Sequence, residues 1–167
     1  MDAEKFTKKS LEVIESCEKL AYEYNNQELT QAHLMYALVT VEDSLIAKLL
    51  TNMGINMDAF TGECEKLVAN RPKASGGQLF TSPEFSKALI QAEKEAKQMG
   101  DDYISVEHIF LGLLEKADKD IKRVINAYGI TRGKFLEVLA NIRGNRKVES
   151  DNPEDTYDAL NKYGYNL

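Results

Sequence analysis

The stretch LTQAHL at residues 29–34 returns as ISVEHI at residues 104–109, and this repetition decides the fold. A shift of 75 positions overlays residues 17–68 on residues 92–143 without a gap, and most apolar positions stay apolar. Such self-similarity is the signature of a repeated structural unit. Two copies are too few for a solenoid, so we expect a duplicated bundle with pseudo-twofold symmetry.

Each copy contains four runs of apolar residues at helical spacing, and seven of these eight runs follow a residue that we expect to cap the helix N-terminus. The expected caps are Thr7, Thr30, Asp43 or Ser44, and Asn56 in the first copy, and Ser82, Ser105 and Thr131 in the second. Gly54, Gly100 and Gly129 stand where helices are expected to end. The sequence therefore predicts an all-α fold of two four-helix repeats.

The dipeptide Phe6-Thr7 also has a counterpart, Phe80-Thr81, but at a shift of 74 positions. This offset predicts that the first helix of the second copy gains one residue. A Pro, a Ser and two Gly residues between the copies predict a flexible loop. We expect repeat one at 1–70, the loop at 71–78, repeat two at 79–143, and a linker at 144–167 in which residues 156–163 form a short helix.

Composition excludes several classes of protein. The 167 residues are 43% hydrophobic and 29% charged, which is enough apolar content for a core. No apolar run is long enough to span a bilayer, and the N-terminus has no secretory h-region. The two cysteines form no disulfide framework and fit a reducing cytosol. A net charge of −6 argues against binding to nucleic acid.

The two copies together resemble the duplicated Clp N-terminal domain, which stands at the head of hexameric AAA+ unfoldases. The residues that carry this resemblance are Phe6-Thr7, residues 29–34 and Gly54-Ile55, with their counterparts Phe80-Thr81, residues 103–114 and Gly129-Ile130. Residues 152–164 look like the segment that joins this domain to the first ATPase module of ClpB-type disaggregases.

The resemblance implies a stress-response chaperone domain that engages unfolded or aggregated polypeptide. It also implies a cytoplasmic, homohexameric parent working with a DnaK-type chaperone system, whereas we expect this chain alone to be monomeric. The sequence contains no G-x-x-x-x-G-K-[ST] motif, so no nest is available to hold nucleotide phosphates. We therefore expect no enzyme activity here, with ATP and Mg²⁺ confined to ATPase domains elsewhere in the parent.

Thr7, Asp101 and Glu107 are similar to polar positions that ClpB-type domains use in substrate work. Each has a structural interpretation as well: Thr7 as a helix cap, Asp101 as a turn residue and Glu107 as a favourable charge in a first helical turn. The adjacent carboxylates Asp101 and Asp102 are expected to point apart in a solvated turn.

Apolar contact is the stronger source of affinity for unfolded chains, because such chains expose what folded proteins bury. Ile90 and Phe110 are the candidate apolar contacts with substrate. Ile90 falls outside the main apolar stripe of its predicted helix and is expected at the surface, and Phe110 lies on the next helix. The resemblance also reveals a departure: Gln91, Glu95 and His108 stand where such a groove is apolar in some relatives.

Two other functions remain open. A ClpC-like receptor holds phosphorylated arginine between the Thr of each Phe-Thr motif and the Glu that precedes the His. The second repeat has both residues, as Thr81 and Glu107. In the first repeat Ala32 replaces the Glu. A ClpA-like domain would instead dock an adaptor protein. A metal site is not expected, because neither C-x-x-C nor H-x-x-x-H occurs, and no catalytic set is visible.

Overall fold

The computed structural model describes residues 2–74, 76–144 and 147–154, which form eight α-helices, one 3₁₀ turn and two very short strands. The expected helix at 156–163 lies outside these residues. The elements follow in the order η1 (Ala3–Lys5), α1 (Lys8–Glu23), β1 (Glu28–Leu29), α2 (Gln31–Thr40), α3 (Leu45–Asn52), α4 (Met57–Ala69), β2 (Phe80–Thr81), α5 (Pro83–Gln98), α6 (Val106–Glu115), α7 (Lys119–Ala127) and α8 (Arg132–Arg143).

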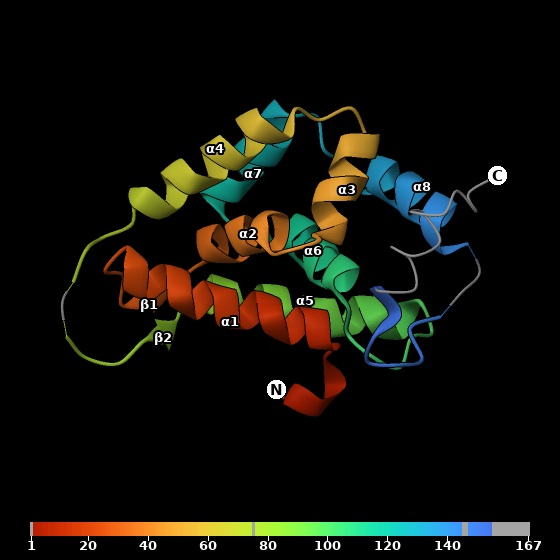
Figure 1. Cartoon of the computed structure of the whole chain (residues 1–167), viewed down its shortest axis with the longest axis horizontal. Coiled ribbons are helices and arrows are strands. Elements are labelled where there is room, and N and C mark those ends of the chain that lie inside the picture. Colours follow the sequence, from red (N-terminus) through yellow and green to blue (C-terminus); the bar gives the residue numbers. More distant parts are fainter. Residues whose placement is uncertain (1, 75, 145–146, 155–167) are drawn as a thin grey trace.

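The all-α fold with four helices in each repeat is confirmed, and the helices are arranged in pairs (Figure 1). Helices α2 and α6, one from each repeat, lie side by side at the centre. The long helices α1 and α5 lie on one side of them, and the pairs α4/α7 and α3/α8 lie on the other. Helices α2 and α6 are equivalent in the two repeats, and so are α1 and α5. Because α3 corresponds to α7 and α4 to α8, the pseudo-twofold relation exchanges the pair α4/α7 with the pair α3/α8.

Local chemistry explains where the helices begin and end. Side chains of Thr7, Ser44, Asn56, Ser82, Asp118 and Thr131 each accept a backbone N–H in the first turn of a helix. Thr30 and Ser105 form capping boxes with His33 and His108. Gly54, Gly100 and Gly129 have positive φ, which lets the chain leave each helix without a Cβ clash. The predicted caps are thus confirmed.

The two repeats exchange their leading segments. Phe6 of repeat one bridges to Ile104 of repeat two, whereas β2 of repeat two pairs in parallel with β1 of repeat one, with Leu29 opposite Thr81. The expectation that α5 gains a residue is wrong, because α1 and α5 both contain 16 residues. Thr7 therefore corresponds to Ser82, not to Thr81, and the 75-residue shift runs through the whole repeat.

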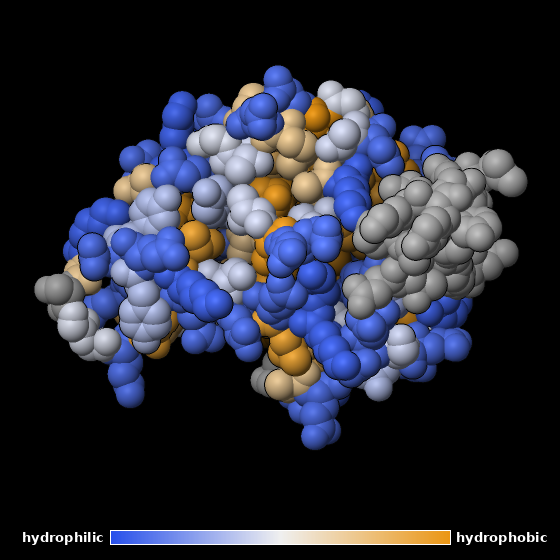
Figure 2. Space-filling model, in the orientation of Figure 1, coloured by the Kyte–Doolittle hydropathy of each residue, from blue (hydrophilic) through white to orange (hydrophobic). Residues whose placement is uncertain are grey.

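The closest helix packing lies between α5 and α6. A Cβ placed on Gly112 would come within 2.3 Å of the Ala88 carbonyl oxygen and 3.0 Å of the Ala92 amide nitrogen. Only glycine allows this approach, which buries Ala88, Ala92 and Phe110 completely. Hydrophilic residues cover most of the face in Figure 2, and hydrophobic residues appear there as small separate patches.

Candidate functional site

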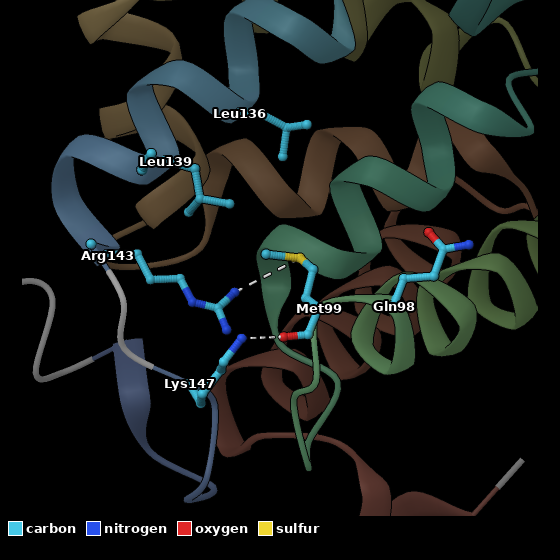
Figure 3. Close-up of a pocket in the computed structure, with 8 residues that line it drawn as sticks. Gln98, Met99, Leu136, Leu139, Arg143 and Lys147 are labelled. Carbon is cyan, nitrogen blue, oxygen red and sulfur yellow. Dashed lines mark hydrogen bonds between the residues drawn. The ribbon is translucent and has the colours of Figure 1, made fainter.

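A pocket of about 410 Å³ opens between the C-terminal end of α5 and helix α8 (Figure 3). Its apolar lining consists of Met99, Leu136, Leu139 and Ala140. Gln98, Arg143, Gly144 and Lys147 complete the lining and add polar groups. We call this feature the α8 pocket; it combines apolar side chains with two cationic ones.

Both cations of the α8 pocket are oriented by Met99. The Lys147 ammonium donates to the Met99 carbonyl oxygen at 2.7 Å, and Arg143 Nη1 lies 3.8 Å from the Met99 sulfur (Figure 3). The Lys147 bond occupies a carbonyl that the end of α5 leaves without an intrahelical partner. These contacts fix the two side chains beside the apolar lining.

Arg143 also connects the α8 pocket to a buried polar cluster. Its Nη2 donates to Asp101 Oδ1, which also accepts the Val148 N–H at 3.0 Å. His108 Nδ1 accepts the Ser105 N–H at 2.9 Å, so Nε2 carries the proton and donates to Asp101 Oδ2 at 2.7 Å. Burial opposes ionisation of Asp101, but these three donors outweigh it and hold the pKa of the carboxyl well below its usual range.

Asp101 and Asp102 do point apart, but only Asp102 is exposed. Our expectation of a solvated turn is therefore wrong for Asp101, because its carboxylate turns inward to a buried guanidinium and imidazole. The same arrangement recurs in repeat one with a neutral residue: His33 Nε2 lies 2.8 Å from Asn26 Oδ1. Burial, together with Arg71 and Lys73, lowers the pKa of His33 to about 4. The two histidines thus share one structural role.

The exchange of leading segments brings Thr7 next to the helix that carries Glu107. Thr7 and Glu107 are fully buried, and Glu154 joins them from the far end of the described chain. Thr7 Oγ1 donates to Glu154 Oε2 at 2.9 Å, and the Val106 N–H at the start of α6 donates to the same oxygen at 3.3 Å. Neither oxygen of Glu107 has a hydrogen-bond partner, although Arg143 Nη1 lies 3.7 Å from one of them.

The other sequence-predicted site residues are dispersed. Ile90 is 50% exposed on α5, as expected. Phe110 is fully buried against Phe135, with ring centroids 4.6 Å apart, so our expectation that it offers surface to a substrate is corrected. Thr81 is exposed on β2 beside Ser86 and pairs with Leu29 of repeat one. The structure therefore does not build the Thr81–Glu107 pair within one repeat.

Gln91, Glu95 and His108, the polar residues at positions that are apolar in some relatives, all form hydrogen bonds within the domain. Arg132 binds the carboxylate of buried Glu95 at 2.6 Å, and Gln91 Nε2 donates to the same carboxylate at 3.0 Å. His108 is held by Asp101, as described above. Within the described ranges, no group of three or more His, Cys, Asp and Glu residues is arranged to hold a metal ion. No described helix is long and apolar enough to cross a membrane.

Two parts of this region escaped the sequence analysis. In the sequence Arg143 is one of several basic residues near the end of α8, and residues 147–154 fall within the predicted linker. Yet Val148 is fully buried and Glu154 is 5% exposed, so this segment packs on the helices. A weak signal existed: a single apolar valine in a polar, acidic stretch. The domain boundary at residue 143 remains a prediction.

Comparison with known proteins places this architecture in a family context. The family model described as the Clp repeat (R) N-terminal domain matches residues 5–128. The chain is 40% identical to the chaperone protein ClpB of Clostridium tetani and 36% identical to that of Bacillus anthracis, each over 172 aligned residues. Both alignments cover all of this chain but 20% of the relative, so the chain spans about a fifth of their length.

Solved structures show the same fold at lower sequence identity. The Hsp104 N-terminal domain from Candida albicans matches with a TM-score of 0.79 and 20% identity, covering 90% of this chain and 99% of that one. The N-terminal domain of ClpD from Arabidopsis thaliana matches with a TM-score of 0.60 and 19% identity, covering 81% and 94%. At these identities the likeness concerns the fold alone.

Proposed function

This chain belongs to the Clp repeat (R) N-terminal domain family, and we propose that it is the substrate-engaging domain of a ClpB-type disaggregase. Its substrates are the exposed hydrophobic segments of unfolded or aggregated proteins. The parent is an AAA+ ATPase that forms a cytoplasmic homohexamer and works with a DnaK-type chaperone system. ATP binding and hydrolysis belong to other domains of that parent.

The observation that carries this proposal is the open apolar lining of the α8 pocket. Met99, Leu136 and Ala140 present aliphatic surface without the hydrogen-bonding pattern that would select one sequence. A shallow apolar site of this kind accepts many side chains, which suits a protein that must recognise unfolded chains in general. Ile90 supplies a second apolar contact elsewhere on α5.

The direct test is to measure binding of this chain to a permanently unfolded polypeptide such as casein. Binding is monitored by titration or by changes in amide chemical shifts. We expect weak binding that survives added salt, since apolar contacts are not screened, and little binding to a folded protein. A binding curve that collapses on adding salt would contradict the proposal, because it would assign the affinity to surface charge.

A substitution in the α8 pocket tests whether this pocket is the substrate-binding site. Ala140 is exposed on α8 and lines the pocket, so Ala140→Gln fills the pocket without adding charge or breaking the helix. Ala127→Gln makes the same change at an exposed position on α7 outside the pocket. We expect Ala140→Gln to weaken casein binding about tenfold, equivalent to ~1.4 kcal/mol, and Ala127→Gln to leave it unchanged. Equal effects from the two variants would place the site elsewhere.

A further inference from the structure

Residues 147–154 form a strap that runs across one end of the helices. The amides of Asp102 and Tyr103 donate to the Val148 carbonyl oxygen at 2.8 and 3.3 Å. Further along, the Lys8 amide donates to the Asp151 carbonyl oxygen at 2.8 Å. The strap is thereby tied first to the turn after α5 and then to the first residue of α1.

The strap ends on a buried carboxylate. Glu154 Oε2 accepts from the Thr7 hydroxyl and from the Val106 N–H, so it occupies the N-terminal end of α6, where the helix dipole favours an anion. The other oxygen, Oε1, is buried and has no hydrogen-bond partner. Thr7 and Glu107, two of the residues singled out from the sequence, lie at this contact and are fully buried.

The charges around Glu154 are unbalanced. From α6 it faces Glu107, whose two oxygens have no hydrogen-bond partner, and from the N-cap of α1 it faces the neutral Thr7 hydroxyl. Arg143 of α8 lies 3.7 Å from Glu107 but donates its hydrogen bond to Asp101, the residue that also holds His108. One buried guanidinium therefore serves both Asp101 and Glu107.

We propose that the strap is releasable and that Glu154 is its latch, closing the site between the N-terminal ends of α1 and α6 while protonated and opening when it ionises. The backbone bonds of the strap are compatible with either state. The side-chain contact of Glu154 is not, because an ionised Glu154 places a second negative charge beside the Glu107 carboxylate, whose oxygens have no hydrogen-bond partner. The device is thus autoinhibitory, since the closed strap keeps Thr7 and Glu107 from any ligand.

The titration of Glu154 agrees with this geometry. Burial first, and then the charge of Glu107, raise its pKa from 4.5 to about 7; together they outweigh the Thr7 hydroxyl and the Val106 N–H, which favour the ionised form. A carboxyl whose pKa is raised by docking stabilises the docked state fully below its ordinary pKa, and this stabilisation is lost as the pH rises through the docked value. Docking should therefore weaken roughly tenfold between about pH 6 and pH 8.

Amide hydrogen exchange on the full chain tests the latch. Protection factors, corrected for the intrinsic pH dependence of exchange, are measured for the Lys8 and Tyr103 amides, which donate to the strap, and for Leu111 inside α6 as a reference. We expect protection of Lys8 and Tyr103 to fall between about pH 6 and pH 8 in the natural sequence, with Leu111 unchanged. Protection that does not change with pH overturns the proposal.

Three variants assign the effect to the right carboxyl. Glu154→Gln keeps an acceptor for Thr7 and Val106 without charge, so its protection should stay high across the same pH range. Glu154→Ala removes the latch, so Lys8 should be poorly protected at both ends of the range. Asp151→Asn neutralises an exposed carboxyl of the same strap and should respond to pH as the natural sequence does. A pH response that persists in Glu154→Gln overturns the assignment.

A consequence for binding rests on the proposed function. If Thr7 and Glu107 take part in substrate work, Glu154→Ala should bind casein several times more tightly than Glu154→Gln does near neutral pH. If both variants bind casein equally while hydrogen exchange behaves as expected, the latch proposal stands. Thr7 and Glu107 are then not part of the substrate-binding site. The exchange experiment alone decides the latch.

Discussion

Asn26 and Asp101 are structural counterparts: their side-chain oxygens lie 2.8 and 2.7 Å from the Nε2 atoms of His33 and His108. A neutral amide therefore suffices to hold a histidine at this place. The carboxylate in repeat two serves a different partner, Arg143, whose side chain is 4% exposed.

This comparison predicts the result of Asp101→Asn. The amide can still hold His108, but Arg143 loses the carboxylate that compensates its burial, so we expect a loss of about 3 kcal/mol in the free energy of unfolding. Urea denaturation measures it. Asp102→Asn, at the exposed neighbour, should change stability by less than about 0.5 kcal/mol.

The pH dependence provides a second check on Asp101. Because its pKa is depressed in the folded protein, its contribution is present above the ordinary carboxyl pKa and is lost as the pH falls below it. The stability difference between the natural sequence and Asp101→Asn should thus shrink below about pH 4. A difference that stays constant down to acid unfolding would mean that the carboxylate charge contributes nothing.

Gly112 should tolerate no side chain. Gly112→Ala forces a methyl group against the backbone of α5, so we expect a loss of about 1–3 kcal/mol measured by thermal or urea unfolding. Gly62, within α4, has open space around its Cα, so Gly62→Ala should raise stability by about 0.5–1 kcal/mol. Opposite signs for the same substitution are the expected outcome, and a gain from Gly112→Ala would refute the close approach.

Phe110 and Ile90 should separate stability from binding. Phe110→Leu disturbs the buried ring pair with Phe135 and should cost roughly 1–3 kcal/mol of unfolding free energy, while casein affinity of the folded fraction stays the same. Ile90→Ser removes exposed apolar surface, so it should leave stability within about 0.5 kcal/mol and weaken binding by about 1 kcal/mol. The reverse pattern would return Phe110 to the substrate site.

The two thiols should be chemically silent in the folded protein. Burial, reinforced by Glu63, raises the pKa of Cys64 to about 12, and burial likewise raises the pKa of Cys17. Labelling with a thiol-reactive chromophore near pH 8 should therefore proceed only through opening of the core and accelerate with denaturant. Rapid stoichiometric labelling without denaturant would show that one of them is accessible.

The sequence reveals those parts of the fold that depend on local chemistry. Caps such as Thr7 and Ser82, and the glycines that end helices, act within one turn of the chain, so residue type and spacing identify them. The pairing of Phe6 with Ile104 joins distant segments through backbone atoms, and two-residue strands carry no alternation of side chains. This is why the Phe-Thr match at a shift of 74 was misleading.

The residues of the candidate site likewise fall into those that the sequence identifies and those that it does not. Asp101 and Glu107 could be chosen from sequence, and Ile90 could be placed on the surface from its position on the helix face. Arg143, Val148 and Glu154 could not, because their partners lie more than 35 positions away along the chain. Long-range polar contacts leave no periodic trace in the sequence.

The exchange of leading segments makes the two halves obligate partners. Each half supplies the segment that pairs with β1 or with Ile104 of the other half. If the connection between α4 and β2 were cut, the two pieces would have to associate as separate molecules, to an extent that depends on their concentrations. In the intact chain that connection acts as a tether, holding the halves at a high effective concentration and turning a bimolecular encounter into a unimolecular one. This fold is, in physical terms, a dimer whose subunits were joined end to end.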